Sequence, residues 1–173
     1  MGYRCYNYPT MKDDRGKYIW TFLRLGMSWI FLWAFIDKVF GLGFATSPDK
    51  AWIMGASPTF GYLTFGTHGP LSSFFQHLAG NAVVDWLFMM GLLGVGLGLL
   101  LGIGIRISGY SGALLLSFIW LSRFPPEQNP FMDEHIIYII ILLGLPVVNS
   151  GRWFPLGTWW SHTPLVQRYP FLQ

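Results

Sequence analysis

The stretch that decides the fold of this chain lies at residues 29 to 41 and reads Trp-Ile-Phe-Leu-Trp-Ala-Phe-Ile-Asp-Lys-Val-Phe-Gly. Most of it is apolar, so it is stable only in lipid or in a deep core, yet it delivers two adjacent opposite charges, Asp37 and Lys38. Charges inside a membrane are costly unless they reach the interface or line a polar site. The pattern predicts a membrane helix whose charged pair is either an interface anchor or part of a polar site.

The composition of the whole chain agrees with a membrane protein. Of its 173 residues, 53% are hydrophobic and only 11% are charged, whereas soluble domains carry about 25% charged residues. Nine Trp, eight Tyr and fifteen Phe suit the aromatic belts at membrane interfaces. We therefore expect one integral membrane domain in contact with membrane lipids. The basic residues are scattered and form no patch, so no nucleic-acid partner is expected.

Four apolar stretches are expected to cross the membrane, at about residues 18–42, 83–105, 107–121 and 135–148. A helical crossing needs about 20 residues, so the last two must borrow flanking residues or lie in locally thin bilayer. Arg106 separates the second and third stretches. One continuous helix would bury this arginine near its middle, so a tight hairpin is expected instead. The predicted fold is an all-α membrane protein, a bundle of four transmembrane helices.

The positive charges predict how the chain is oriented, because cytoplasmic loops are enriched in Lys and Arg. In the four-span arrangement one side carries Lys12, Arg15, Lys17, Arg106, Arg152 and Arg168, and the other side carries Lys38, Lys50 and Arg123. We expect a multi-pass protein of the cell membrane with cytoplasmic tails at residues 1–17 and 150–173 and a membrane domain at 18–149. The long, aromatic loop from Gly43 to Ala82 would then be extracytoplasmic and form short interfacial helices or a cap.

Metal and haem sites are not expected. Cys5 is the single cysteine, which excludes a disulfide within the chain and a Cys-x-x-Cys-His haem attachment. No two of the outer histidines have metal-ligand spacing on a helix; these are His68, His77 and His135. A haem held between His77 and His135 is the weaker alternative.

Three glycines in the second span follow one another at intervals of four residues. They are Gly94, Gly98 and Gly102. Small residues on one helix face let a neighbouring backbone approach closely. This spacing therefore predicts helix packing.

Polar residues occur at the outer ends of several spans and form the candidate site. A bundle would bring these ends together, so Asp37, Lys38, Asp85, Asp133 and His135 are expected to form a polar rim. The alternatives are an interface anchor for Asp37 and Lys38 and helix capping for Asp133 and Glu134. Histidine and carboxylates exchange protons near neutral pH.

Aromatic side chains lie close to this rim. Trp29 and Trp33 are one helical turn apart and, with Trp120, are expected to wall a flat apolar slot. Such a slot beside polar groups suits a quinone, whose ring stacks on aromatics while its carbonyls need hydrogen bonds. Arg24, two turns into the first span, either extends to the inner interface or faces the bundle and binds an acid or a ligand.

Several motifs resemble the DoxX/DoxD family of small four-helix membrane proteins. They include Arg24-Leu25-Gly26, Phe31-Leu32-Trp33-Ala34-Phe35-Ile36-Asp37-Lys38 and, most specifically, Asn129-Pro130-Phe131-Met132-Asp133-Glu134-His135-Ile136. The resemblance covers about residues 18 to 173. The DoxD branch is a subunit of thiosulfate:quinone oxidoreductase, so the resemblance implies a quinone cofactor and partner subunits of a membrane redox complex. It does not fix which residues form the quinone site.

Two functions follow from these observations. The first is a membrane redox subunit that passes electrons from a sulfur donor to quinone, with the rim residues as the polar site and Trp29, Trp33 and Arg24 beside the quinone. The second is a non-catalytic accessory subunit packed in a larger respiratory or other membrane complex. The chain contains no evident site for an electron-carrying cofactor, which is the main difficulty for the first hypothesis.

Overall fold

The computed structural model describes residues 14–126, 129, 131–153 and 155–172. Within those ranges the chain is helical and contains no strand. The first part of the predicted N-terminal tail, with Cys5 and Lys12, lies outside the described residues, and so do Glu127 and Pro130 of the predicted outer turns.

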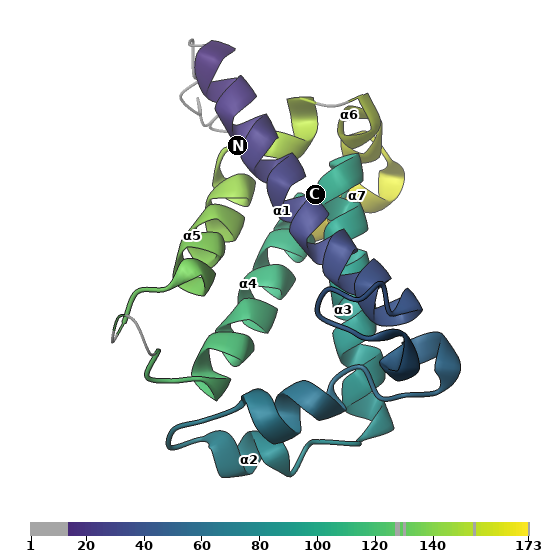
Figure 1. The fold of residues 1–173 in the computed structure, drawn as a ribbon. Coiled ribbons are helices and arrows are strands. Elements are labelled where there is room, and N and C mark those ends of the chain that lie inside the picture. The colour runs from purple at the N-terminus through teal and green to yellow at the C-terminus, as the bar shows by residue number, and fades with distance from the viewer. Residues whose placement is uncertain (1–13, 127–128, 130, 154, 173) are drawn as a thin grey trace.

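Four helices form the body of the molecule: α1 (Asp14–Phe40), α3 (Ala82–Leu101), α4 (Ile105–Ser122) and α5 (Glu134–Val147). They run alternately in opposite directions (Figure 1). The most extensive contacts join α4 to α5, α1 to α3 and α3 to α4, while α1 and α5 touch over a smaller area. At one end of the bundle, α1 and α4 finish and α3 and α5 begin. We call this the loop end. The opposite end is the tail end.

Three of these helices are long and apolar enough to cross a membrane. They are Gly16–Phe40 within α1, α3 and α4. Only 22%, 33% and 39% of their most apolar windows is buried inside the molecule, so most of their apolar side chains face outward, as in a protein surrounded by lipid. The fourth helix, α5, has 14 residues and is about 21 Å long, which is less than the roughly 30 Å of a hydrocarbon core. The fourth crossing therefore stays a prediction.

The turn between α3 and α4 is short because two glycines take left-handed backbone conformations. Gly102 has φ 74° and Gly104 has φ 61°, values that residues with a Cβ rarely adopt. Gly102 caps α3 by donating its N–H to Gly98 O. Helix α3 therefore ends before the predicted boundary at Ile105, and Arg106 falls in the first turn of α4. The hairpin thus keeps this arginine at the tail end and out of the middle of the bundle.

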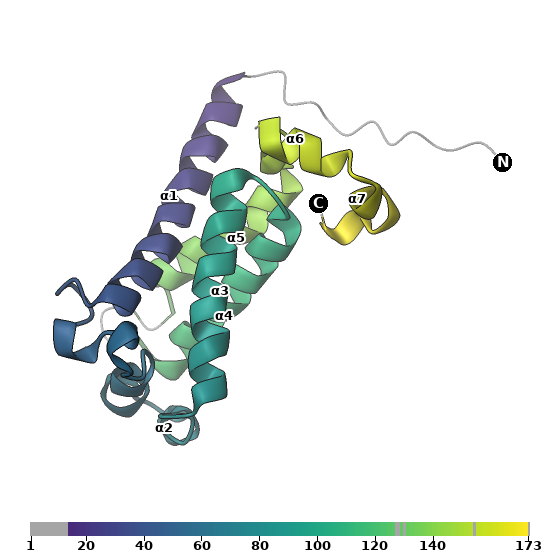
Figure 2. The same cartoon turned by 90° about the vertical axis from the view of Figure 1, so that its right-hand side faces the viewer.

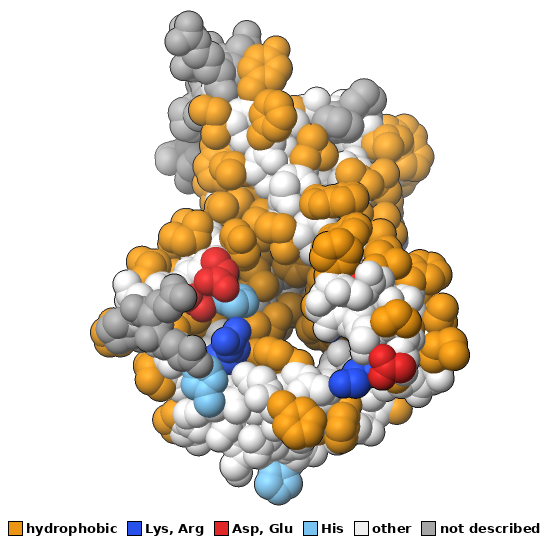
Figure 3. Space-filling model, in the orientation of Figure 1, with side chains coloured by type: hydrophobic (Ala, Val, Ile, Leu, Met, Phe, Trp, Pro, Cys, Tyr) orange, Lys and Arg blue, Asp and Glu red, His pale blue; other side chains and the backbone are white. Residues whose placement is uncertain are grey.

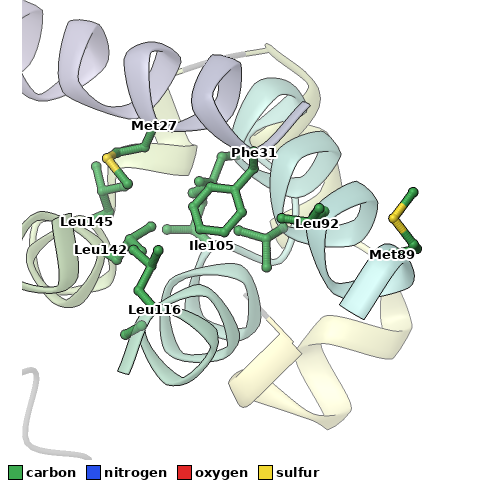
Figure 4. Packing of buried hydrophobic residues seen from close by; sticks show 11 residues of the cluster. Met27, Phe31, Met89, Leu92, Ile105, Leu116, Leu142 and Leu145 are labelled. Atoms are coloured by element: carbon green, nitrogen blue, oxygen red, sulfur yellow. The ribbon is translucent and has the colours of Figure 1, made fainter. Parts of the chain in front are cut away.

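The core is a cluster of apolar side chains from all four helices (Figure 4). Phe31 of α1 lies near its centre, with Leu92 of α3 on one side and Leu142 of α5 on the other. Gly112 of α4 completes the meeting point. A Cβ on Gly112 would lie 3.0 Å from Val95, 3.2 Å from Leu142 and 3.3 Å from Phe31, so the four helices converge on a residue without a side chain.

The glycine spacing correctly predicted that helices pack closely at glycines, but only partly predicted at which glycines. A Cβ on Gly94 would meet nothing within 4 Å, so that part of the prediction is wrong, whereas one on Gly98 would collide with Ser108 Oγ. The close approach of α4 to α5 occurs at Gly109, where a Cβ would lie 2.6 Å from Leu142 O. Pro146 has no N–H to bond this carbonyl along α5, so the oxygen faces Gly109 without its usual partner.

The segment from 43 to 82 covers the loop end with four short helical pieces (Figures 1 and 2). They are η1 (Pro48–Lys50), η2 (Trp52–Met54), η3 (Tyr62–Gly66) and α2 (Ser72–Gln76). The expected short helices are therefore present. Their position on one side of a membrane stays a prediction.

The C-terminal part gathers at the tail end, opposite that segment (Figure 2). It consists of η4 (Ser150–Trp153), α6 (Pro155–Ser161), α7 (Pro164–Arg168) and η5 (Pro170–Leu172). The Trp160 indole donates to Leu172 O at 2.8 Å, and Arg106 Nη1 donates to Pro170 O at 3.2 Å. The first bond joins η5 to α6, and the second holds η5 against the start of α4.

Candidate functional site

Asp37 is buried at the end of α1, with 1% of its surface exposed. Its carboxylate accepts hydrogen bonds from Ala45 N at 3.0 Å and Phe44 N at 3.4 Å. The side chain therefore satisfies backbone donors of the turn that follows its own helix. Lys38 points elsewhere, with its ammonium nitrogen 5.9 Å from the centre of the Phe88 ring. The structure thus brings Asp37 to the loop and Lys38 to α3.

Asp85, in the first turn of α3, is engaged in a similar way. Its Oδ1 accepts from Ser57 Oγ at 2.9 Å, from Thr59 N at 3.3 Å and from Thr59 Oγ1. Three donors from one short stretch of the loop thus converge on a single carboxylate oxygen. Such charge-assisted bonds are stronger than neutral ones. Asp85 therefore fixes the middle of the loop to the start of α3.

Asp133 and His135 form a hydrogen-bonded pair at the start of α5. Asp133 is the N-cap, and its Oδ1 accepts from Ile136 N at 3.2 Å. Its Oδ2 lies 2.9 Å from His135 Nδ1, and the two side chains are 19% and 16% exposed. A carboxylate that accepts from Nδ1–H selects that tautomer and leaves Nε2 to act on a ligand. The capping prediction for Asp133 is therefore confirmed, and its second oxygen orients the imidazole.

Glu134 joins this pair without completing a metal site. Its Oε1 is 3.9 Å from His135 Nδ1, and its side chain is 65% exposed. The three residues place one ligand atom each within 4.8 Å of one another. However, they are consecutive in sequence, and His135 already bonds Asp133. We assign no metal to them.

A second polar junction joins η3 to the end of α4. The Tyr62 hydroxyl and Ser122 Oγ are 2.7 Å apart, and His68 N donates to Ser122 O at 3.1 Å. Burial raises the pKa of the Tyr62 hydroxyl, so this group stays neutral and able to donate a hydrogen bond. Sequence reasoning missed Tyr62 and Ser122, because 60 residues separate them and no local spacing links them.

Three polar atoms in this junction are buried without a hydrogen-bond partner among the residues that the structure describes. They are Thr64 Oγ1, His68 Nε2 and Trp120 Nε1. Buried polar groups are nearly always satisfied by protein, water or a ligand. Each of these three atoms therefore keeps unused hydrogen-bonding capacity.

The loop end is hollowed beside its charged groups. Figure 3 shows acidic, basic and histidine side chains lying next to one another at the edge of a depression. Among the described residues, the charged and histidine side chains that follow η3, end α4 or begin α5 are His68, Arg123, Asp133, Glu134 and His135. Arg123 is exposed at the C-cap of α4. Carboxylate, imidazole and guanidinium groups are thus available at one end of the bundle.

The tryptophans of the predicted slot each pack against another aromatic ring, and the slot itself stays a prediction. Trp29 is 61% exposed and stacks on Trp33 with ring centres 5.6 Å apart. Trp33 also contacts the Phe44 ring at 5.1 Å, whereas Trp120 packs against Phe124 at 5.0 Å. Trp29 therefore faces outward from α1, where a membrane would surround it with lipid.

Arg24 lies far from the polar rim, because it is in the half of α1 nearer the tail end. It is fully buried, and its Nη1 donates to Leu99 O at 2.7 Å and to Leu100 O at 3.5 Å. These carbonyls belong to the last turn of α3, where the helix leaves acceptors unsatisfied. A cation is also favoured at that end of the helix dipole. Arg24 therefore caps α3 through these carbonyls, and a role in binding a ligand stays a prediction.

No family model, curated protein or solved structure matches this chain. Its function must therefore be argued from the geometry of its own residues. Polar atoms at the start of α5 and at the junction of η3 with α4 keep hydrogen-bonding capacity for a ligand.

Proposed function

We propose that this chain is a multi-pass membrane subunit of a quinone-linked redox complex, of the thiosulfate:quinone oxidoreductase type that its DoxX/DoxD-like motifs imply. The observation that carries the proposal is the Asp133–His135 pair, with Nδ1 and Oδ2 2.9 Å apart, at the loop end of an apolar bundle. The hollow beside this pair is the place for the quinone headgroup.

The chemistry assigned to this chain is binding and proton transfer. Reduction of a quinone to a quinol would take up two electrons and two protons, of which His135 would donate one and water at the loop end the other. His135, when protonated, donates from Nε2 to a quinone oxygen, and Asp133 stabilises the imidazolium through Nδ1, as a carboxylate does for a general acid–base histidine. Arg123, at the C-cap of α4 at the same end of the bundle, would favour negative charge on the reduced ring. Oxidation of the sulfur donor by the assembled complex supplies the electrons.

A second function, that of an accessory subunit, is favoured by the way two rim residues are used. Asp37 and Asp85 accept hydrogen bonds from this chain's own loop, which is what a structural role requires. Many large apolar side chains on the helices are exposed, among them Trp86 at 58%, Phe118 at 52% and Ile140 at 57%. In this alternative, they pack against helices of partner subunits and lipid, and the chain takes no part in chemistry.

Substitutions at the start of α5 separate the two functions. His135→Ala removes the proposed proton donor, and Asp133→Asn removes the charge that orients it while keeping a good N-cap residue. Loss of a hydrogen bond to a charged group is worth about 1.5–3 kcal/mol, so quinone reduction per assembled complex should fall about tenfold or more. Asp49→Asn is the matched control and should keep wild-type turnover, since it removes the charge of an exposed carboxylate in η1, outside the proposed site. Turnover that falls only in proportion to lost complex would establish the accessory role.

The proposed topology has four crossings, with both termini in the cytoplasm and the loop end outside. Helix α5 would cross together with the residues that flank it. In a Cys5→Ser background, Met54→Cys is a suitable probe because Met54 is 73% exposed, whereas Thr67 in the same segment is buried. Intact cells should label Met54→Cys with a membrane-impermeant maleimide. Labelling that requires permeabilised cells would reverse the orientation.

A further inference from the structure

An open groove of about 630 Å³ lies at the tail end, between the start of α4 and the end of α5. Arg106 and Ile107 of α4 line one side, Val147 and Asn149 line the other, and Phe171 closes it from the C-terminal segment. Its volume is within the range of about 300–1,000 Å³ that is usual for small-molecule sites. The groove therefore has room for a ligand.

The groove is amphiphilic, with a cationic end and apolar walls. Large parts of Ile107, Tyr110, Val147 and Phe171 are exposed, at 42%, 55%, 73% and 61%. Arg106 provides positive charge, and Arg152 lines an adjoining cavity of about 20 Å³ together with Arg106. No Asp or Glu occurs among the described residues that line either space. An anion with an attached hydrocarbon chain matches both halves of this surface.

The position of the groove along the helices matches the boundary of a membrane. Arg106 is the second residue of α4, and Val147 is the last residue of α5. Tyr110 lies about one turn deeper in α4, on the side where the helix continues as an apolar span. The cation is therefore at the depth of lipid headgroups, while the apolar walls extend toward the depth of acyl chains. Basic pockets at this depth between membrane helices bind anionic lipid headgroups.

We infer that this groove binds an anionic phospholipid. The phosphate lies against the Arg106 guanidinium, with Arg152 adding positive charge nearby, and one acyl chain follows Ile107 and Tyr110 along α4. Arg106 gives one N–H to Pro170 O, and a guanidinium carries five N–H donors, so it can bind phosphate without releasing the C-terminal segment. The inference requires that the chain lies in a membrane. It does not depend on quinone chemistry.

Lipid competition tests this inference on the purified, full-length protein. Native mass spectrometry and thermal unfolding would compare nanodiscs of phosphatidylcholine alone with nanodiscs that also contain phosphatidylglycerol. We expect the protein to retain phosphatidylglycerol in preference to phosphatidylcholine. We also expect a higher unfolding temperature in the nanodiscs that contain phosphatidylglycerol. Equal retention and stabilisation by phosphatidylcholine would overturn the inference. Inorganic phosphate is the second probe, and an equal shift with phosphate alone would assign the site to a free anion instead of a lipid.

Charge variants locate the site. Arg106→Gln should lower phosphatidylglycerol affinity about tenfold or more, because it removes a charged hydrogen bond. Arg168→Gln is the matched control, since it removes the same charge from an exposed residue that lines neither space. An equal loss in both variants would mean that lipid binds through net charge alone and would overturn the site. Circular dichroism checks that each variant folds, and Arg106→Lys, which keeps the charge, should retain the preference for phosphatidylglycerol.

Discussion

The two ends of the bundle seal their backbone groups with side chains of opposite charge. At the loop end, Asp37, Asp85 and Asp133 accept hydrogen bonds from backbone N–H groups of the loop and of α5. At the tail end, Arg24 and Arg106 donate to backbone carbonyls. Backbone N–H and C=O groups without a hydrogen bond are costly where water is scarce, so both ends of the bundle need side-chain partners for them. Carboxylates bind the open N–H groups at the loop end, and guanidinium groups bind the open carbonyls at the tail end.

This difference affects how candidate functional residues are chosen. A charged residue at the end of a membrane helix is first a cap, and it becomes a candidate for chemistry only if atoms remain after the backbone is satisfied. His135 has such an atom in Nε2, because its Nδ1 is the one that pairs with Asp133. The hydrogen bonds of Asp37 and Asp85 to the loop give these carboxylates a structural role. Catalytic roles for Asp37, Lys38 and Asp85 stay predictions.

The largest effect is expected from breaking the tail-end cap. Arg24→Leu would leave Leu99 O and Leu100 O without this donor, and each unsatisfied buried group costs about 1–3 kcal/mol. We expect a loss of about 2–5 kcal/mol, measured as a lower unfolding temperature in detergent. Arg168→Gln is the control, with an expected loss below about 1 kcal/mol because Arg168 is exposed. Equal unfolding temperatures for Arg24→Leu and the wild type would show that α3 does not need Arg24 as a cap.

A smaller effect is expected at the loop end from Asp85→Asn. The substitution keeps the shape but removes the charge that strengthens the bonds from Ser57 and Thr59, so we expect a loss of about 1.5–3 kcal/mol. The loop should open, and limited proteolysis between residues 43 and 82 should become faster. Asp49→Asn, at an exposed position of the same loop, should not change the rate. Cleavage at the wild-type rate in Asp85→Asn would contradict the proposed anchor.

The smallest effect on stability is expected from Asp37→Asn. Its two hydrogen bonds are 3.0 and 3.4 Å long, and an asparagine oxygen can keep one of them, so we expect a loss of about 1 kcal/mol. If Asp37 only seals the turn, quinone reduction per assembled complex should equal that of the wild type. A fall of about tenfold without loss of complex would return Asp37 to the polar site. The comparison with His135→Ala uses the same assay.

The helices were predictable from sequence, and many of their contacts were not. Apolar length located α1, α3 and α4, and the charge of Arg106 predicted the hairpin. The exact end of α3 was missed because Gly102 acts as a cap as well as a small residue. The role of Arg24 was missed because its acceptor, 75 residues away, is a backbone carbonyl. Any residue supplies that carbonyl, so sequence carries no sign of it.

The candidate site also has one part that the sequence predicted and one part that it did not. Asp133 and His135 were found because they are two residues apart on one helix start, where local geometry decides their contact. The junction of Tyr62 with Ser122 depends on how the loop folds back over α4, which no periodicity encodes. Glycine spacing likewise predicted close packing of α3 but only part of its location, since a Cβ on Gly94 would meet nothing within 4 Å, one on Gly98 would meet Ser108, and the close approach to α5 is at Gly109 of α4.

The meeting of four helices at Gly112 has a consequence for how a mutational scan of this protein would read. Val95, Leu142 and Phe31 all lie within 3.3 Å of the position that a Cβ would take, so alanine would need small shifts from three neighbours and larger residues would force the helices apart. Gly112 would score among the least tolerant positions although it has no side chain with which to bind or react. Intolerance to substitution would therefore mark the structural centre of this protein as readily as its chemistry. Only an assay that counts turnover per folded molecule would tell the two apart.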